Sequence, residues 1–115
     1  MPTALLHVNS DEIRALNRGF GGLLEMNSTV DSVFQSASYA TSFWDKVAIV
    51  VRSIAGGHLF DNGNKRTAFE AVKLFKLRNH VVTGTNDTIL RETVRLVAIH
   101  ALQDTRQIAQ SLRGF

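Results

Sequence analysis

Apolar side chains recur at helical spacing along most of this chain, and that spacing limits the folds it can adopt. Three segments place apolar residues three and four positions apart, which lines one face of an α-helix. Alternation of the kind that strands need is weak in the same segments. We therefore predict an all-α fold. The three stripes are Val47, Val50, Val51 and Ile54; Ala68, Ala71, Val72 and Phe75; and Leu90, Val94, Val97, Ala98 and Ala101.

Polar and glycine residues indicate where the helices begin and end. A first helix is expected to begin at Ser10, because two carboxylates follow it, and to end at the glycines at 19, 21 and 22. Residues 23–43 carry a mixed pattern that fits a short helix, a flap or both, and only 28–42 or 80–85 offer short strands. The expected helix starts are Ser10, Asp45, Asn64, and Asn86 or Asp87, with a last short helix over 104–115 that buries Ile108 and Leu112.

Composition predicts one globular domain over residues 1–115, because the chain has 44% hydrophobic residues, one proline and no linker-like stretch. The absence of cysteine excludes disulfides and thiolate metal sites. We expect no membrane association and no signal peptide, hence a cytoplasmic site of action, or delivery as the C-terminal toxin domain of a larger secreted effector. A net charge of +3 favours an anionic ligand but is too small for a nucleic-acid footprint.

The loop between the second and third predicted helices holds the residues with the most chemistry. His58 has a side chain suited to taking a proton near neutral pH. Gly63 permits a positive φ, so that backbone amides can converge on an anion. Lys65 and Arg66 lie at the start of a helix, where cations are unfavourable unless an anion joins them. The ring of Phe60 is expected to be buried and to anchor the loop.

Residues 58–68 read HLFDNGNKRTA. This run resembles the signature of the Fic/Doc family: histidine, any residue, phenylalanine, two residues, glycine or alanine, asparagine and a basic end. It covers about a tenth of the chain. The resemblance implies a compact Fido-like helical bundle with the active-site loop between two central helices.

Two positions favour the Doc branch, whose members are death-on-curing toxins. Adenylyl-transferring Fic enzymes usually carry a second glycine where this chain has Lys65, and a further arginine where it has Phe69. Doc-type toxins carry lysine and lack that arginine. The resemblance therefore implies a protein kinase that moves the γ-phosphate of ATP to a hydroxyl residue, with a threonine of elongation factor Tu as the first candidate acceptor and arrest of translation as the result.

The same resemblance implies a role for each residue of the loop. His58 would be the general base, and Mg²⁺ would bridge phosphate oxygens. The position that commonly holds an acidic metal ligand is Asn62, and the carboxylate stands one residue earlier at Asp61. A neutral ligand binds the ion less tightly than a carboxylate. Either Asn62 suffices as the metal ligand, or Asp61 assists it, or activity is weak, and we expect the first. The phosphate-binding residues would be Gly63, Asn64, Lys65 and Arg66, and Asn64 could also cap its helix.

Other interpretations remain open at this point. A Fic-type adenylyl- or nucleotidyltransferase, or a non-catalytic binding module of the same fold, would use the same loop. Thr88 and Glu92 have the spacing of the family's inhibitory helix, but Thr93 follows them and breaks the match, so a separate antitoxin is expected. Residues expected to be structural or merely exposed are His7, His80 and His100, with Phe43 and Trp44 in the core.

Overall fold

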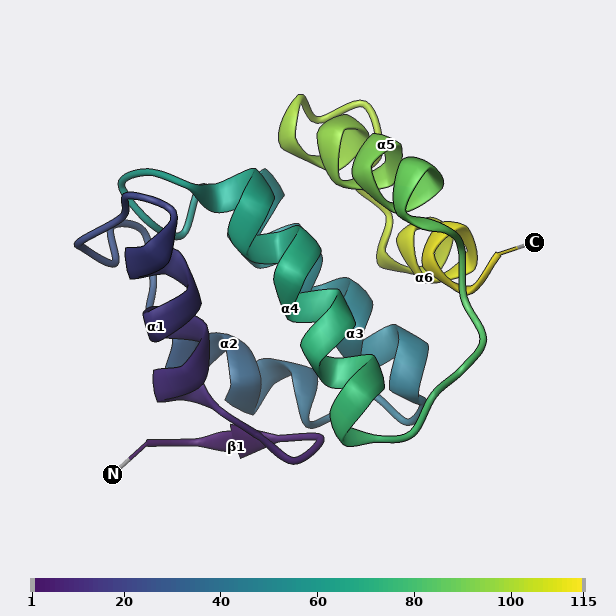
Figure 1. Cartoon of the computed structure of the whole chain (residues 1–115), viewed down its shortest axis with the longest axis horizontal. Helices are drawn as coiled ribbons and strands as arrows, with labels where there is room; N and C mark the ends of the chain where they lie inside the picture. The colour runs from purple at the N-terminus through teal and green to yellow at the C-terminus, as the bar shows by residue number, and fades with distance from the viewer. Residues whose placement is uncertain (1, 115) are drawn as a thin grey trace.

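Helices account for most of the structure, a computed structural model that describes residues 2–114 (Figure 1). This result confirms the all-α prediction. Two short antiparallel strands, β1 (Ala4–Leu5) and β2 (Val8–Asn9), form a hairpin before the first helix. No helix of the described chain is long and apolar enough to cross a membrane. The helices are α1 (Ser10–Gly19), α2 (Val30–Ala37), α3 (Phe43–Val51), the π-helical segment η1 (Arg52–Gly56), α4 (Asn64–Arg78), α5 (Asp87–Ala98) and α6 (Thr105–Arg113).

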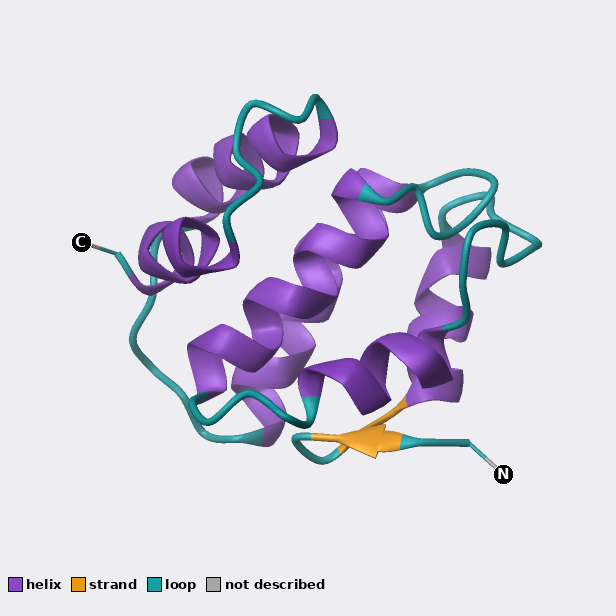
Figure 2. Ribbon diagram, turned by 180° about the vertical axis from the view of Figure 1, so that it is seen from behind, coloured by secondary structure: helices purple, strands orange, loops and turns teal. Residues whose placement is uncertain are grey.

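Helices α3 and α4 run through the middle of the bundle, with α1 and α2 on one side and α5 and α6 on the other (Figures 1 and 2). The valines of α3 are poor helix formers, at a cost of about 0.5 kcal/mol each. Burying each side chain returns about 1.5 kcal/mol or more, so packing decides the conformation. Phe34 and Phe75 meet in the core with ring centroids 5.9 Å apart. The predicted stripes are buried, except that Ala98 is half-buried and Ala101 lies exposed beyond the end of α5.

Side-chain caps begin five of the helices, and two of the predicted caps are wrong by one and three residues. Asn9 rather than Ser10 caps α1, through a capping box with Glu12. Ser42 rather than Asp45 caps α3 and accepts the Asp45 amide at 3.1 Å. In both cases a neighbouring polar side chain competed for the same role, which local sequence does not resolve. The remaining caps are Thr29, Asn86 and Asp104.

The segment 23–43 contains both structures that its mixed pattern allowed. Residues 23–27 form a flap, and Glu25 makes an isolated antiparallel bridge with Phe60. Residues 30–37 form α2. The short strands considered for 28–42 or 80–85 are not found there; among residues 2–114 the named strands lie at 4–9 instead.

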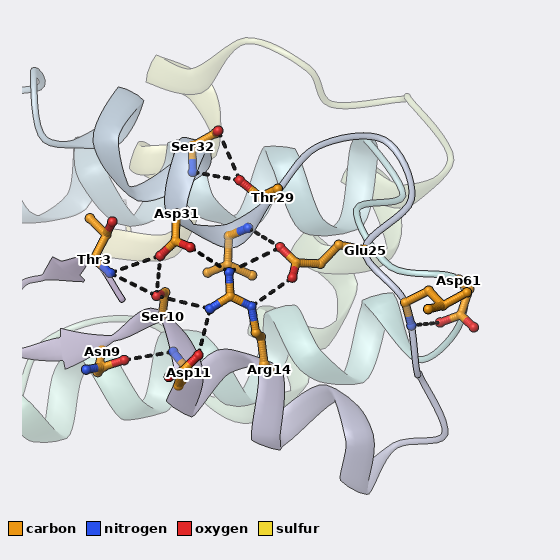
Figure 3. A network of polar contacts seen from close by, with 12 residues as sticks. Thr3, Asn9, Ser10, Asp11, Arg14, Glu25, Thr29, Asp31, Ser32 and Asp61 are labelled. Atoms are coloured by element: carbon orange, nitrogen blue, oxygen red, sulfur yellow. Dashed lines mark hydrogen bonds and ion pairs between the residues drawn. The ribbon is translucent and has the colours of Figure 1, made fainter. Parts of the chain in front are cut away.

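A charged network ties the flap and α2 to α1 (Figure 3). The guanidinium of Arg14 contacts Glu25 at 2.7 Å, Asp31 at 2.8 Å and Asp11 at 2.7 Å. These carboxylates raise the pKa of Arg14, with Glu25 as the largest cause. The Ser10 hydroxyl donates to Asp31 at 2.5 Å, and this bond, together with Arg14, holds the pKa of Asp31 well below its ordinary value. One arginine thus joins three segments.

We predict that Asp31→Asn lowers the free energy of unfolding at pH 7 by about 1–2 kcal/mol, the range for a hydrogen bond to a charged group reduced by solvent screening. A carboxylate whose pKa is lower in the folded state stabilises the protein above its unfolded pKa of about 4, and this stability is lost as the pH falls. Urea unfolding at pH 7 and near pH 2 should therefore show a smaller difference between variant and wild type in acid.

The control is Asp45→Asn, which removes a half-buried first-turn carboxylate on α3. It should change the stability by less than about 0.5 kcal/mol at pH 7. An Asp31→Asn protein as stable as wild type at pH 7 would contradict the role assigned to the network.

Candidate functional site

The segment 57–63, which we call the His58 loop, connects η1 to α4. It lies beside the flap at one end of the bundle (Figures 1 and 2). Phe60 is buried, as predicted, and its backbone is held by Asn64. The Asn64 side chain accepts from the Phe60 amide at 2.9 Å and donates to the Phe60 carbonyl at 2.8 Å. Asn64 is the first residue of α4 and does not cap it. The N-cap position is occupied by Gly63, and the Asn64 side chain bonds to Phe60 instead.

A left-handed residue lets the chain pass from the loop into α4. Gly63 has φ +72°, and a Cβ added there would lie 2.6 Å from the Phe20 carbonyl oxygen. On the inner side, the buried Asn17 donates to the Asn62 carbonyl at 2.8 Å and to the Thr67 hydroxyl at 3.1 Å. The loop is therefore bound to α1, and through Asn17 it is joined to α4.

The flap pairs with the outer edge of the His58 loop. The Met26 amide donates to the Leu59 carbonyl at 2.7 Å, and the Asp61 amide donates to the Leu24 carbonyl at 3.0 Å. The Asn27 side chain donates to the carbonyls of Gly57 and His58 at 3.1 and 2.9 Å. These contacts hold the backbone on either side of the imidazole.

His58 is exposed, and its ring stacks on that of His100. The ring centroids are 6.0 Å apart with an interplanar angle of 29°. A ring nitrogen of His100, Nε2, lies 2.8 Å from the Gly56 carbonyl oxygen, so that a protonated Nε2 donates to it. Both histidines have positive φ, +47° and +64°, an uncommon conformation for residues other than glycine. Sequence reasoning missed His100, since nothing in its neighbours links it to the loop.

The start of α4 differs from the five helix starts that have a side-chain cap. It has no side-chain cap and no acidic residue in its first turn. The Gly63 amide donates to the Asn62 Oδ1 atom at 2.9 Å. Lys65 and Arg66 are exposed, and Arg66 lies over the Phe20 ring at 4.6 Å from the centroid. A cation in a first turn costs about 0.3–1 kcal/mol, and an anion bound at the helix start would reverse that cost.

The two candidate metal ligands face the flap and the loop backbone. The Oδ1 atom of Asp61 accepts from the amides of Leu23 and Leu24 at 2.9 and 3.1 Å, and these bonds lower the pKa of Asp61. The Asn62 oxygen already accepts from Gly63. Within residues 2–114 no group of three His, Asp or Glu side chains could hold a metal ion.

Two hollows lie against the site. A cleft of about 460 Å³ is bounded by Gly57 and His100 together with Asn27 of the flap. A smaller recess of about 270 Å³ begins at Lys65 and Arg66 and continues over α5.

In comparisons with known proteins, no protein-family model, no curated sequence and no solved structure matches this chain. The motif in residues 58–68 and the geometry around it are thus the basis for any assignment of function.

We predict that Gly63→Ala destabilises the protein by about 1–3 kcal/mol, because alanine is strained at this φ and its Cβ would collide with the Phe20 carbonyl. Gly19→Ala is the matched control, since a Cβ there meets no atom within 4 Å and alanine favours the helix. Thermal unfolding of both variants measures the difference. Equal midpoints would show that the left-handed turn is not needed.

Proposed function

We propose that this chain is a Doc-type member of the Fic/Doc family with a Fido-like fold, and that it moves the γ-phosphate of ATP to a hydroxyl residue of a protein. One observation carries the proposal: a single anchored loop bears an exposed imidazole near one end and enters an uncapped, cationic helix start at the other. A general base and an anion site are the two parts that phosphoryl transfer to an alcohol requires.

In the proposed reaction, His58 takes the proton of the acceptor hydroxyl while the hydroxyl oxygen attacks the γ-phosphorus. The bond from that phosphorus to the β,γ-bridging oxygen breaks, and ADP leaves with the bonding electrons. Gly63 and Asn64 position the phosphates at the start of α4, and Lys65 and Arg66 neutralise their charge. The products are the phosphorylated protein, ADP and the proton held on His58.

The residues present fit a magnesium ion that is held mainly by the nucleotide. The amides of Leu23 and Leu24 both donate to the Oδ1 atom of Asp61, and the residue is exposed to solvent. An aspartate is ionised at neutral pH, and the bonds from the flap amides lower the pKa of Asp61 further. In this proposal Asp61 would supply a negative charge to the ion and Asn62 an amide oxygen. Both residues would thus contribute, whereas the sequence led us to expect Asn62 alone. Bound Mg²⁺ would neutralise and align the phosphate oxygens.

His100 is a positioning residue in this proposal. Its ring lies against one face of the His58 ring, and the bond to the Gly56 carbonyl holds it there. A stacked neighbour reduces the freedom of an exposed imidazole, so that more of the His58 population faces the incoming hydroxyl. His100 itself does not touch the reacting atoms.

The proposed function implies two protein partners, an acceptor and an inhibitor. The acceptor we would test first is elongation factor Tu, whose modification would arrest translation in the cytoplasm. Thr88 and Glu92 are part of α5, and Glu92 is paired with Arg95 of the same helix. The inhibitor that covers His58 would then be a separate antitoxin protein. No role for nucleic acid or membrane is proposed.

The deciding experiment incubates the protein with elongation factor Tu and ATP labelled at either the γ- or the α-phosphate. We expect transfer of γ-label only, loss of transfer on chelation of Mg²⁺, and a rate reduced about 10²–10⁴-fold in His58→Ala, the usual contribution of a general base. His80→Ala is the control, since His80 is also exposed and has a positive φ of +55°.

Transfer of α-label would instead identify a nucleotidyltransferase. Unchanged transfer by the His58→Ala protein would remove the catalytic role of the loop. No transfer to any protein of a bacterial lysate would favour a non-catalytic binding module.

For His100→Ala we predict a kcat about tenfold lower with an unchanged KM for ATP, because the variant disturbs the base and not the phosphate site. His100→Phe retains a stacking ring and should recover most of the lost kcat. Steady-state kinetics of the three proteins measure this. Equal losses in the alanine and phenylalanine variants would show that the stacked ring is not what positions His58.

A further inference from the structure

A group of positive side chains lies beside the proposed phosphate site, outside the His58 loop. The recess of about 270 Å³ is lined by Lys65 and Arg66 from α4 and by Arg91 and Arg95 from α5. Phe69 and Val94 are its apolar members, and Glu70 is its one carboxylate. We call this hollow the cationic recess. Two of its four cations belong to the Fic/Doc-like motif, and the other two are brought there by packing of α5 on α4.

The cations from α5 are held in place by neighbouring groups. The guanidinium of Arg91 lies 4.6 Å from the centroid of the Phe69 ring. Arg95 forms an ion pair with Glu92 on the same helix. Since Arg91 and Arg95 are four residues apart, they share one face of α5 and lie about 6 Å apart along its axis. Two ordered guanidinium groups with this separation can contact successive anionic groups of one ligand.

The charge of the recess indicates the ligand. Four cations around a hollow of this size repel one another, and Glu70 and Glu92 offset part of that repulsion. A polyanionic ligand would neutralise the remaining repulsion between the cations. Phosphate groups suit this role because arginine binds phosphate oxygens preferentially. The first turn of α4 has two cations and no carboxylate, and a bound anion would offset the unfavourable position of these charges at a helix start.

We infer that the cationic recess binds the α- and β-phosphates of the nucleoside triphosphate whose γ-phosphate lies beside His58. The inference rests on the proposed function, and it extends the site from α4 to α5. Lys65 and Arg66 belong to both regions, so the phosphate chain passes from the start of α4 over these residues and reaches Arg95 and Arg91. Arg91 and Arg95 are binding residues, remote from the attacking hydroxyl.

Binding of inorganic tripolyphosphate, measured by calorimetry on the full chain with Mg²⁺, tests the inference without requiring catalysis. We expect Arg91→Gln and Arg95→Gln each to weaken tripolyphosphate binding about tenfold, whereas Arg91→Lys retains the charge and loses less than about threefold. Arg106→Gln is the matched control, because Arg106 is an exposed arginine of α6 outside the recess. Circular dichroism confirms that each variant is folded.

The transfer assay gives a second readout. Arg91→Gln should raise the KM for ATP about tenfold and leave kcat within twofold, since the side chain contacts no reacting atom. Tripolyphosphate binding that is absent in the wild type, or equal in the Arg91→Gln, Arg95→Gln and Arg106→Gln proteins, would overturn the inference. The proposed function is judged separately, by whether the wild type transfers γ-label and His58→Ala does not.

Discussion

Two hydrogen bonds between the Asn64 side chain and the backbone of Phe60 are the contact on which the site depends. They join the start of α4 to the middle of the His58 loop, and the buried Phe60 ring joins that loop to the core. With Gly63 in the left-handed region, the chain then turns directly into the helix. His58 and the first turn of α4 are therefore held in a constant relation. A reaction that needs a base and a phosphate site at one place requires such preorganisation.

The stability of the site is connected to the charged network on the opposite side of the flap. Glu25 bridges the backbone of Phe60, and its carboxylate is bound by Arg14 of α1. The same guanidinium reaches Asp31 at the start of α2. Because Asp31 stabilises the fold only while it is ionised, acid weakens the network that positions the flap. Glu25 thus belongs both to the network that stabilises the fold and to the contacts that position the His58 loop.

Helices α4 and α5 together form a region of positive charge. Five helices begin at a side chain that accepts from their first amides, whereas α4 has a glycine at its N-cap and two cations in its first turn. Arg91 and Arg95 on α5 extend this positive region, and His100 follows the end of the same helix. Helix α5 and the turn after it thus contribute the far wall of the recess and a stacking partner for His58.

Local sequence alone determined the helical stripes, the buried Phe60 and the presence of a base, a glycine and two cations in one loop. These features depend on spacing within a few residues, which periodicity and residue chemistry report directly. Tertiary structure decided that Asn64 binds Phe60 rather than capping α4, that Asn62 faces Gly63, and that His100 reaches His58. The contact between His100 and His58 joins residues far apart in the sequence, so it follows from how the helices dock on the packed core. The bonds of Asn64 and Asn62 are local, but several local partners compete for each side chain, and the conformation that the packed loop adopts decides between them.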